Sequence, residues 1–149
     1  MSQPNLTASF TVDQTPEEAF AAINNVRAWW SGEIEGDTDR LGSEWTYRYK
    51  EFHTSTQKIV ELSPGKKVVW LVTDSYLAFV QDKKEWNGTR ITFEIAPKGG
   101  KTEVVFTHVG LAPKDECFAL CSDAWNSYIT GSLRDLIAAG KGRPNAKES

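Results

Sequence analysis

The stretch that decides the fold is residues 115–139, DECFALCSDAWNSYITGSLRDLIAA. Its apolar side chains recur every three or four positions, which is the period of an α-helix. The resulting stripe comprises Cys117, Phe118, Cys121, Ala124, Trp125, Tyr128, Ile129, Ser132, Leu133, Leu136 and Ile137. The segment predicts an amphipathic helix of about seven turns at 3.6 residues per turn, and Gly140 is suited to end it. We expect Cys121, Trp125 and Leu136 to be largely buried.

Upstream of this helix the apolar residues alternate with polar ones, which is typical of half-buried strands. Strands are predicted over residues 5–13, 45–50, 54–62, 67–73, 76–81, 89–95 and 102–109. Turn residues separate several of them, with a strong hairpin signal at Asn87-Gly88. A sheet with one apolar face must bury that face, and the long helix is the only element large enough to cover it.

Two short helical segments are predicted between the first strand and the rest. Thr15 can cap a helix whose first position suits Pro16, and Glu18 completes a capping box. Residues 26–30 predict a second helical turn, closed by Ser31-Gly32.

The order of these elements predicts an α+β fold. A curved antiparallel sheet of six to seven strands should wrap around the long C-terminal helix. The 149 residues fit one domain, with a core over about 5–140 and a polar tail over 141–149. Because a curved sheet and a straight helix do not match along their whole length, we expect a cavity between them.

Several strings in the chain carry a family resemblance. They are VRAWWSG at 26–32, EWNGT at 85–89, THVGL at 107–111, Ser132-Leu133 and Gly140-Lys141-Gly142. With the order of elements, they resemble the START-like (Bet v 1-like, SRPBCC) helix-grip superfamily, in the branch related to the C-terminal domain of the activator of heat-shock-protein-90 ATPase. The resemblance covers about residues 5–142 and implies the helix-grip fold.

The resemblance implies no single function. The superfamily hosts lipid carriers, hormone receptors, cyclases, hydrolases and co-chaperone modules on one scaffold. The eukaryotic co-chaperone also has a separate N-terminal domain that makes its main chaperone contacts. One domain fills the present 149 residues, so we do not expect the activator activity to carry over.

Composition excludes other classes of protein. Seventeen Lys and Arg face twenty Asp and Glu, for a net charge of −3 without a basic patch, so no nucleic-acid partner is expected. No apolar stretch approaches the roughly 20 residues that span a bilayer. The start MSQPNLTASF lacks the features of a signal peptide, and a cytoplasmic location is expected.

The aromatic residues indicate where a ligand would sit. Six Trp, four Tyr and seven Phe are present, and several fall on the inward faces of strands and helix. The predicted cavity lining is Trp45, Tyr47, Tyr49, Phe93, Phe106, His108, Cys121, Trp125, Tyr128 and Ser132. Trp29 and Trp30 are expected at the cavity entrance, one facing in and one on the surface. The alternative is that the same rings simply fill a solid core.

Evidence for metal or catalytic chemistry is weak. Cys117 and Cys121 are one helical turn apart, which is neither a C-x-x-C motif nor the geometry of an unstrained disulfide. His53 and His108 are the only histidines, and they do not make a four-ligand zinc set with these thiols. Nucleophile elbow, P-loop, dinucleotide and zinc-protease motifs are missing. Glu85 and Glu103 belong to a charged hairpin, which is usually a solvated face. No metal and no cofactor are expected.

The leading hypothesis is therefore binding of a small apolar or amphipathic molecule between sheet and helix. The first alternative is a protein-interaction module with a chaperone partner. The second is an enzyme of the cyclase or hydrolase type that uses His108 or a tyrosine as acid or base. The sequence names neither the ligand nor the oligomeric state.

Overall fold

A computed structural model describes residues 6–30, 33–49, 53–77, 86–109, 123–140 and 142. In this part of the chain one antiparallel sheet has the strand order β1-β7-β6-β5-β4-β3-β2. The strands are β1 (Leu6–Val12), β2 (Glu33–Gly36), β3 (Glu44–Tyr49), β4 (His53–Ser63), β5 (Lys67–Leu77), β6 (Arg90–Lys98) and β7 (Lys101–Val109). Strands β2 to β7 pair in sequence order, and β1 pairs with β7 at the far edge. The predicted antiparallel meander is confirmed.

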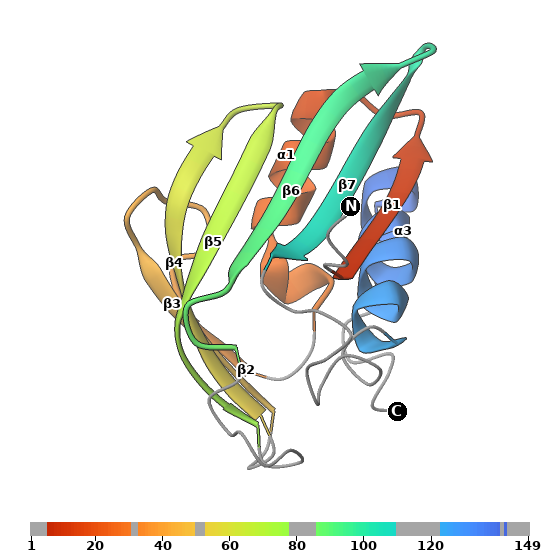
Figure 1. Cartoon of the computed structure of the whole chain (residues 1–149). Coiled ribbons are helices and arrows are strands. Elements are labelled where there is room, and N and C mark those ends of the chain that lie inside the picture. The colour runs from red at the N-terminus through yellow and green to blue at the C-terminus, as the bar shows by residue number, and fades with distance from the viewer. Residues whose placement is uncertain are drawn as a thin grey trace, which may run out of the picture.

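The helices lie on one face of this sheet (Figure 1). After β1 come α1 (Pro16–Asn24) and a 3₁₀ turn, η1 (Val26–Ala28). The C-terminal helix is α-helical over residues 123–126, π-helical over η2 (Ser127–Leu133) and α-helical again over α3 (Arg134–Ala139). Helix α1 contacts β6 and β7, whereas η2 and α3 contact β1. The predicted α+β helix-grip arrangement is confirmed. In the described residues no helix is long and apolar enough to cross a membrane.

The start of α1 has the predicted capping box. Thr15 Oγ1 accepts from the backbone N–H of Glu18 at 3.1 Å, and Glu18 Oε1 accepts from the N–H of Thr15 at 2.9 Å. Pro16 occupies the first turn, where its missing N–H costs nothing. These contacts fix where α1 leaves the sheet and turn its buried side chains, Ala19 and Ile23, toward the core.

Two strand predictions need correction. Strand β2 was not predicted, because its sequence EIEG has only one large apolar residue; pairing of Ile34 with Tyr47 on β3 holds it in the sheet. The separate strand expected over 76–81 is wrong at its start, since β5 runs without a break to Leu77; residues 78–81 lie outside the described residues. The polar residues Asp74 and Ser75 resemble a turn in sequence, yet they pair with Thr56 and Ser55 on β4.

Two irregularities in pairing shape the sheet. The register between β4 and β5 shifts once between Thr56 and Gln57 and again between Ile59 and Glu61. Bulges of this kind bend a strand and increase its local twist. They lie in the middle of the sheet's long strands, where bending helps the sheet to curve around the helix.

The π-helical segment changes which residues face the sheet. Buried positions recur every fourth residue at Trp125, Ile129, Leu133 and Ile137. Because hydrogen bonds from i to i+5 widen the turn, the inward face moves one position toward the C-terminus. The expected burial of Leu136 is therefore wrong: Leu136 is half-buried at the margin of the core, and Ile137 takes the inward place.

The helix ends as predicted at Gly140, which adopts φ +80° and donates its N–H to Leu136 O at 3.0 Å. Cys117 and Cys121, at the other end of the predicted helix, lie outside the described residues.

Candidate ligand-binding site

Strand register brings the predicted inward residues onto one face of the sheet. Tyr47 on β3 lies opposite Ser55, Phe93 on β6 lies opposite Phe106, and His108 lies opposite Ile91. Residues opposite one another in a sheet point to the same side. Together with the inward residues of the C-terminal helix they form one buried cluster between sheet and helix.

Trp30 is the centre of this cluster. Its ring stacks on Tyr47, with centroids 4.2 Å apart and planes 2° from parallel. It also packs against Trp45 at 5.8 Å and Trp125 at 4.9 Å. Trp29 is buried too, against Trp70 and Phe93. The expectation that one ring of the pair rests on the surface is wrong, and the entrance role of the pair stays a prediction.

All six tryptophans of the chain join this network of rings, including Trp70 and Trp86, which were not predicted as site residues. Trp86 stacks on Trp125 at 5.9 Å and meets His53 and His108 edge-on at 4.6 and 4.7 Å. It was missed because it directly precedes the Asn87-Gly88 turn and was read as part of a solvated hairpin. The available signal was a large apolar ring inside an otherwise polar turn.

His108 is a buried, neutral imidazole. Its Nε2 lies 2.8 Å from Thr89 Oγ1, and that hydroxyl lies 2.6 Å from the backbone oxygen of Trp86. A carbonyl oxygen can only accept, so the single Thr89 proton goes to Trp86 O and His108 Nε2–H must donate to Thr89. Nδ1 is then an acceptor, and no described residue pairs with it. Burial, with a smaller contribution from His53, lowers the pKa of His108 to about 3.

His53 borders the same cluster. Its ring stands edge-on between Tyr47 at 4.9 Å and Trp86 at 4.6 Å. Burial lowers its pKa to about 3 as well. Both histidines of the chain are therefore uncharged at neutral pH.

A row of small polar side chains crosses the neighbouring strands. Ser55 and Gln57 on β4 and Ser75 on β5 are buried. Gln57 Nε2 donates to Ser55 Oγ at 2.6 Å, and Ser75 Oγ donates to Asn87 Oδ1 at 2.7 Å. Sequence reasoning missed this row because residues 54–58 are polar on both faces of the strand, so alternation does not show which face is inside.

Several polar atoms within this interior have no hydrogen-bond partner among the described residues. They are Nε1 of Trp45, Trp70, Trp86 and Trp125, Oε1 of Gln57 and Nδ1 of His108. Buried polar groups in proteins are nearly always paired, so each such atom needs an explanation. Trp29 shows the ordinary case, since its Nε1 donates to Ile23 O at 3.2 Å.

The predicted lining residues fall into three groups by their burial in the structure. Those buried together are Trp45, Tyr47, Phe93, Phe106, His108, Trp125, Tyr128 and Ser132. Tyr49 is half-buried and packs against this cluster, and Cys121 lies outside the described residues. Their role as the lining of a ligand cavity stays a prediction. Within the described ranges no three His, Cys, Asp or Glu side chains are grouped so as to hold a metal ion.

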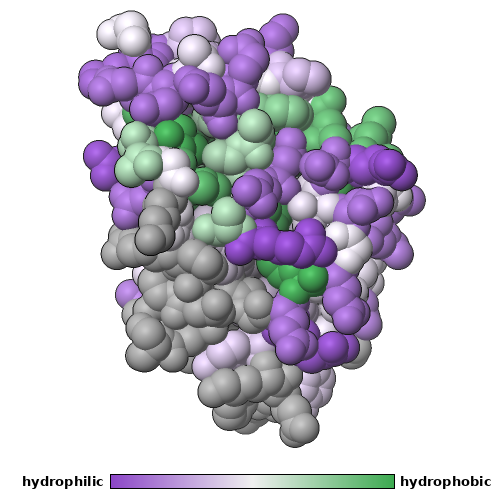
Figure 2. All heavy atoms as spheres, turned by 180° about the vertical axis from the view of Figure 1, so that it is seen from behind, coloured by the Kyte–Doolittle hydropathy of each residue, from purple (hydrophilic) through white to green (hydrophobic). Residues whose placement is uncertain are grey.

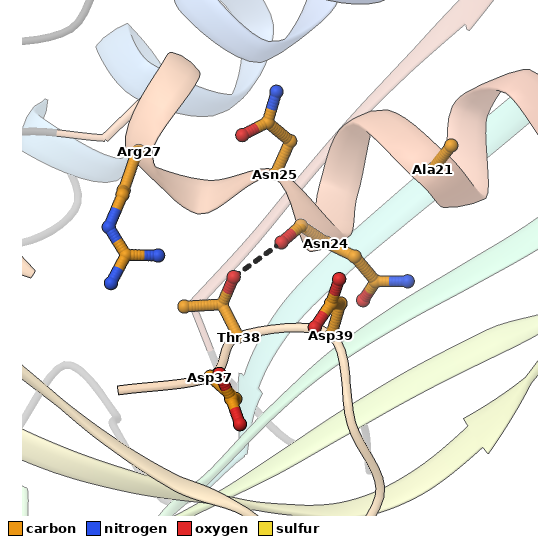
Figure 3. A pocket seen from close by; sticks show the side chains of 7 residues that line it. All are labelled: Ala21, Asn24, Asn25, Arg27, Asp37, Thr38 and Asp39. Atoms are coloured by element: carbon orange, nitrogen blue, oxygen red, sulfur yellow. Dashed lines mark hydrogen bonds between the residues drawn. The ribbon is translucent and has the colours of Figure 1, made fainter. Parts of the chain in front are cut away.

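A separate, polar hollow lies between α1 and the loop after β2 (Figure 3). It has a volume of about 310 Å³ and is lined by Ala21, Asn24, Asn25, Arg27, Asp37, Thr38 and Asp39. Thr38 Oγ1 donates to Asn24 O at 2.7 Å. Arg27 donates to the backbone oxygens of Ile34 and Gly36 at 3.0 and 2.9 Å. These bonds connect the β2 edge of the sheet to α1 and η1, which is a structural role.

Comparisons with known proteins agree with this fold. The model of the family described as "Activator of Hsp90 ATPase homolog 1-like protein" matches residues 13–138. The solution structure of the Aha1 dimer from Colwellia psychrerythraea is similar, with 25% identity and a TM-score of 0.75, over 94% of this chain and 100% of that one.

More distant structures share the fold alone. Protein SSP2350 from Staphylococcus saprophyticus has 17% identity and a TM-score of 0.67, over 93% of this chain and 95% of its own. DynU16, a putative protein in the dynemicin biosynthetic locus, has 11% identity and a TM-score of 0.67, over 95% of this chain and 49% of its own. A search of curated proteins gave no match. The chain therefore belongs to the Activator of Hsp90 ATPase homolog 1-like family, within the START/Bet v 1-like helix-grip superfamily.

Proposed function

We propose that this protein binds a small apolar or amphipathic molecule between the sheet and the C-terminal helix. The observation that carries the proposal is a set of polar atoms inside the aromatic cluster, such as Trp125 Nε1 and Gln57 Oε1, that find no partner among the described residues. A core that exists only to be filled pairs its buried polar groups, because leaving one unpaired costs about 1–3 kcal/mol. A binding site leaves such groups for its ligand.

The surrounding rings supply the contact area that binding needs. Pockets for small molecules are mostly apolar and aromatic, with a few polar groups that fix orientation. Trp30, Tyr47 and Trp125 provide the first feature, and the unpaired atoms provide the second. Apolar burial yields roughly 25 cal/mol per Å² before the cost of association, so a compound of modest size should bind in about the micromolar range.

The test is a titration with apolar fluorophores, sterols, fatty acids and flavonoids. At least one class should quench tryptophan emission and raise the melting temperature, because a ligand that binds only the folded state stabilises it. Trp125→Ala should abolish the response, whereas Tyr76→Ala, at an exposed position on β5, should leave it unchanged. If every class leaves both emission and melting temperature unchanged, the proposal fails.

A chaperone-associated interaction module is the second candidate, favoured by the family to which the chain belongs. Such a partner would need an accessible apolar surface. The large exposed apolar residues in the described part of the chain, Leu41, Tyr76 and Val109, come from different elements. On the helix side, hydrophilic residues interrupt the apolar areas (Figure 2). Titration with a purified chaperone of the ninety-kilodalton heat-shock class would detect this activity directly.

The enzyme alternative receives little support from His108. A general base works best when its pKa lies near the working pH. Burial holds the pKa of His108 at about 3, which makes its Nδ1 a weak base but leaves it a good hydrogen-bond acceptor. This favours a role in orienting a ligand over a role in proton transfer.

A further inference from the structure

Four tryptophan N–H groups without a partner belong to one connected group of rings. Trp45 comes from β3, Trp70 from β5, Trp86 from the turn before β6 and Trp125 from the C-terminal helix. Trp45 and Trp70 are in contact at 4.9 Å, and Trp86 and Trp125 are in contact at 5.9 Å. Trp30 joins the two pairs. We call these four N–H groups the indole donor set.

Trp29 differs from the indole donor set because its N–H has an acceptor within the protein. The fold supplies a backbone oxygen to Trp29 and supplies no acceptor to the other four among the described residues. An indole nitrogen can only donate, so each member of the set can be satisfied only by an oxygen or another acceptor. The acceptors are therefore not atoms of the described residues, and ligand atoms or water can supply them.

In this cluster, the buried acceptors that lack a partner among the described residues are fewer than the donors. In the same cluster they are Gln57 Oε1 and His108 Nδ1, the latter fixed as an acceptor by the Thr89 bond. The unpaired atoms named here, all of them on described residues, are four donors and two acceptors. A complementary molecule carries more acceptors than donors.

The lack of charge on the buried polar residues further restricts the class of ligand. The buried polar residues in the described ranges are Asn24, Thr38, Ser55, Gln57, Ser75, Thr89, Thr102, His108 and Ser132. None of them carries a charge, since His108 is neutral at physiological pH. A carboxylate or an ammonium group placed among these rings would find no buried counter-charge on a described residue, and burying an unpaired charge is strongly unfavourable.

We infer that the ligand is an uncharged apolar molecule that carries carbonyl or ether oxygens, which accept hydrogen bonds from the indole donor set. Hydroxyl groups on it can donate to Gln57 or His108. The inference rests on the proposed function, because it names the chemical class that the same site takes. It excludes fatty acids and other carboxylates as preferred ligands.

Three matched naphthalenes test it: 2-acetylnaphthalene, 2-ethylnaphthalene and 2-naphthoate. They share one ring system and differ in whether the substituent is an acceptor, apolar or charged. The acetyl compound should bind about five- to tenfold more tightly than the ethyl compound, which is the usual net effect of one hydrogen bond. The naphthoate should bind most weakly of the three.

The indole N–H signals provide a readout independent of affinity. In a ¹H–¹⁵N spectrum the six tryptophans give six side-chain signals, assigned by single Trp→Phe variants. The acetyl compound should shift at least one signal of the indole donor set downfield, and the Trp29 signal should move least. The ethyl compound should cause no such downfield shift.

Trp→Phe variants separate the effect of the hydrogen bond on ligand preference from the effect of the shape of the site. Trp125→Phe keeps an aromatic ring but removes an N–H, so it should reduce the preference for the acetyl over the ethyl compound. Trp29→Phe, which removes an N–H that is already paired, should leave that preference unchanged. Each preference is a ratio measured within one variant, so a general loss of affinity cancels. If Trp125→Phe does not fold, Trp45→Phe replaces it.

Four results would overturn the inference. The ethyl compound could bind as well as the acetyl compound, or the naphthoate could bind best; either leaves ligand binding itself intact. Alternatively, magnetisation transfer from water could show that resident water holds all four N–H groups and stays when the acetyl compound binds. If none of the three compounds binds, the inference also fails, and the broader ligand panel then decides separately whether the protein binds small molecules.

Discussion

His108 Nε2 and Thr89 Oγ1 lie 2.8 Å apart inside the protein, and this one bond fixes the state of the imidazole. The Thr89 proton is already committed to Trp86 O, so His108 must carry its proton on Nε2. The pair thereby links β7 to the turn that positions Trp86. It also leaves Nδ1 as an acceptor in an interior whose unpaired atoms are mostly donors.

Stability should fall in mild acid because of His108. Its pKa is about 3 in the folded protein and about 6.5 when unfolded, so below pH 6.5 the unfolded state binds more protons. The unfolding free energy is therefore greatest above pH 6.5 and decreases as the pH falls toward 3. At pH 5 this histidine alone should account for about 2 kcal/mol of the loss. Urea unfolding at pH 7 and pH 5 measures the difference.

The control for this prediction is His108→Gln, which cannot titrate. The variant should show a difference between pH 7 and pH 5 that is smaller by about 2 kcal/mol. The pH dependence of the unfolding free energy that remains in the variant comes from other titrating groups, chiefly His53. Burial lowers the pKa of His53 to about 3 as well. An unchanged pH dependence in the variant would contradict the assignment.

Removing the buried Thr89 hydroxyl should destabilise the protein more than removing an exposed threonine hydroxyl does. Thr89→Val keeps the shape of the side chain but leaves the buried His108 Nε2–H without a partner, whereas Trp86 O keeps the bond from the backbone N–H of Thr89. The unpaired donor should cost about 1–3 kcal/mol. Thr73→Val is the matched control, because its hydroxyl makes an exposed bond to Thr56 O at 3.3 Å. Its effect should stay within about 0.5 kcal/mol. Equal effects in urea unfolding would show that the His108 bond is not significant for stability.

The C-terminal helix allows a second matched pair. Leu133 is fully buried and Leu136 is half-buried, although a regular helical period places both in the stripe. Leu133→Ala should cost about 2–5 kcal/mol, which is usual for a buried leucine, and Leu136→Ala should cost clearly less. Thermal or urea unfolding of the two variants tests the π-helical shift of register. The reverse order would indicate a regular α-helix in this segment.

Sequence alone predicted the architecture well because its signals are local. The alternation of Trp45, Tyr47 and Tyr49 and the capping residues at Thr15 each depend on near neighbours in the chain. Strand β2 depends instead on pairing with β3, and the displacement of Leu136 from the inward face depends on a π-helical segment. Neither has a pattern of its own in the sequence.

The candidate site was predicted in part for the same reason. Phe93, Phe106 and Trp125 follow the periods of their elements and were placed correctly in the core. Trp86 lies in a turn and Gln57 lies on a strand that is polar on both faces, so periodicity could not assign them. Only the folded arrangement shows that their polar atoms face an interior without partners.

Replacing the polar pair Ser55 and Gln57 should weaken ligand binding without lowering the stability of the protein. Replacing both by Ala and Met removes Gln57 Oε1, which is unpaired, together with the one bond that the two side chains share. Because replacing both partners of a buried hydrogen bond by apolar groups can be neutral or stabilising, the unfolding free energy of Ser55→Ala/Gln57→Met should stay equal or rise. Binding of hydroxyl-bearing aromatic compounds should weaken, because Gln57 no longer accepts from them.

The matched control uses the other face of the same strands. Thr46 and Thr56 share a hydrogen bond of 3.0 Å between their hydroxyls, on the side of the sheet away from the aromatic cluster. Thr46→Val/Thr56→Val should leave the affinity for the same compounds unchanged, as measured by quenching of tryptophan emission. If the Ser55/Gln57 variant is strongly destabilised and keeps full affinity, the two side chains serve the fold rather than a ligand. If it keeps its stability and loses affinity while the threonine variant does not, the unpaired oxygen of Gln57 belongs to a binding site.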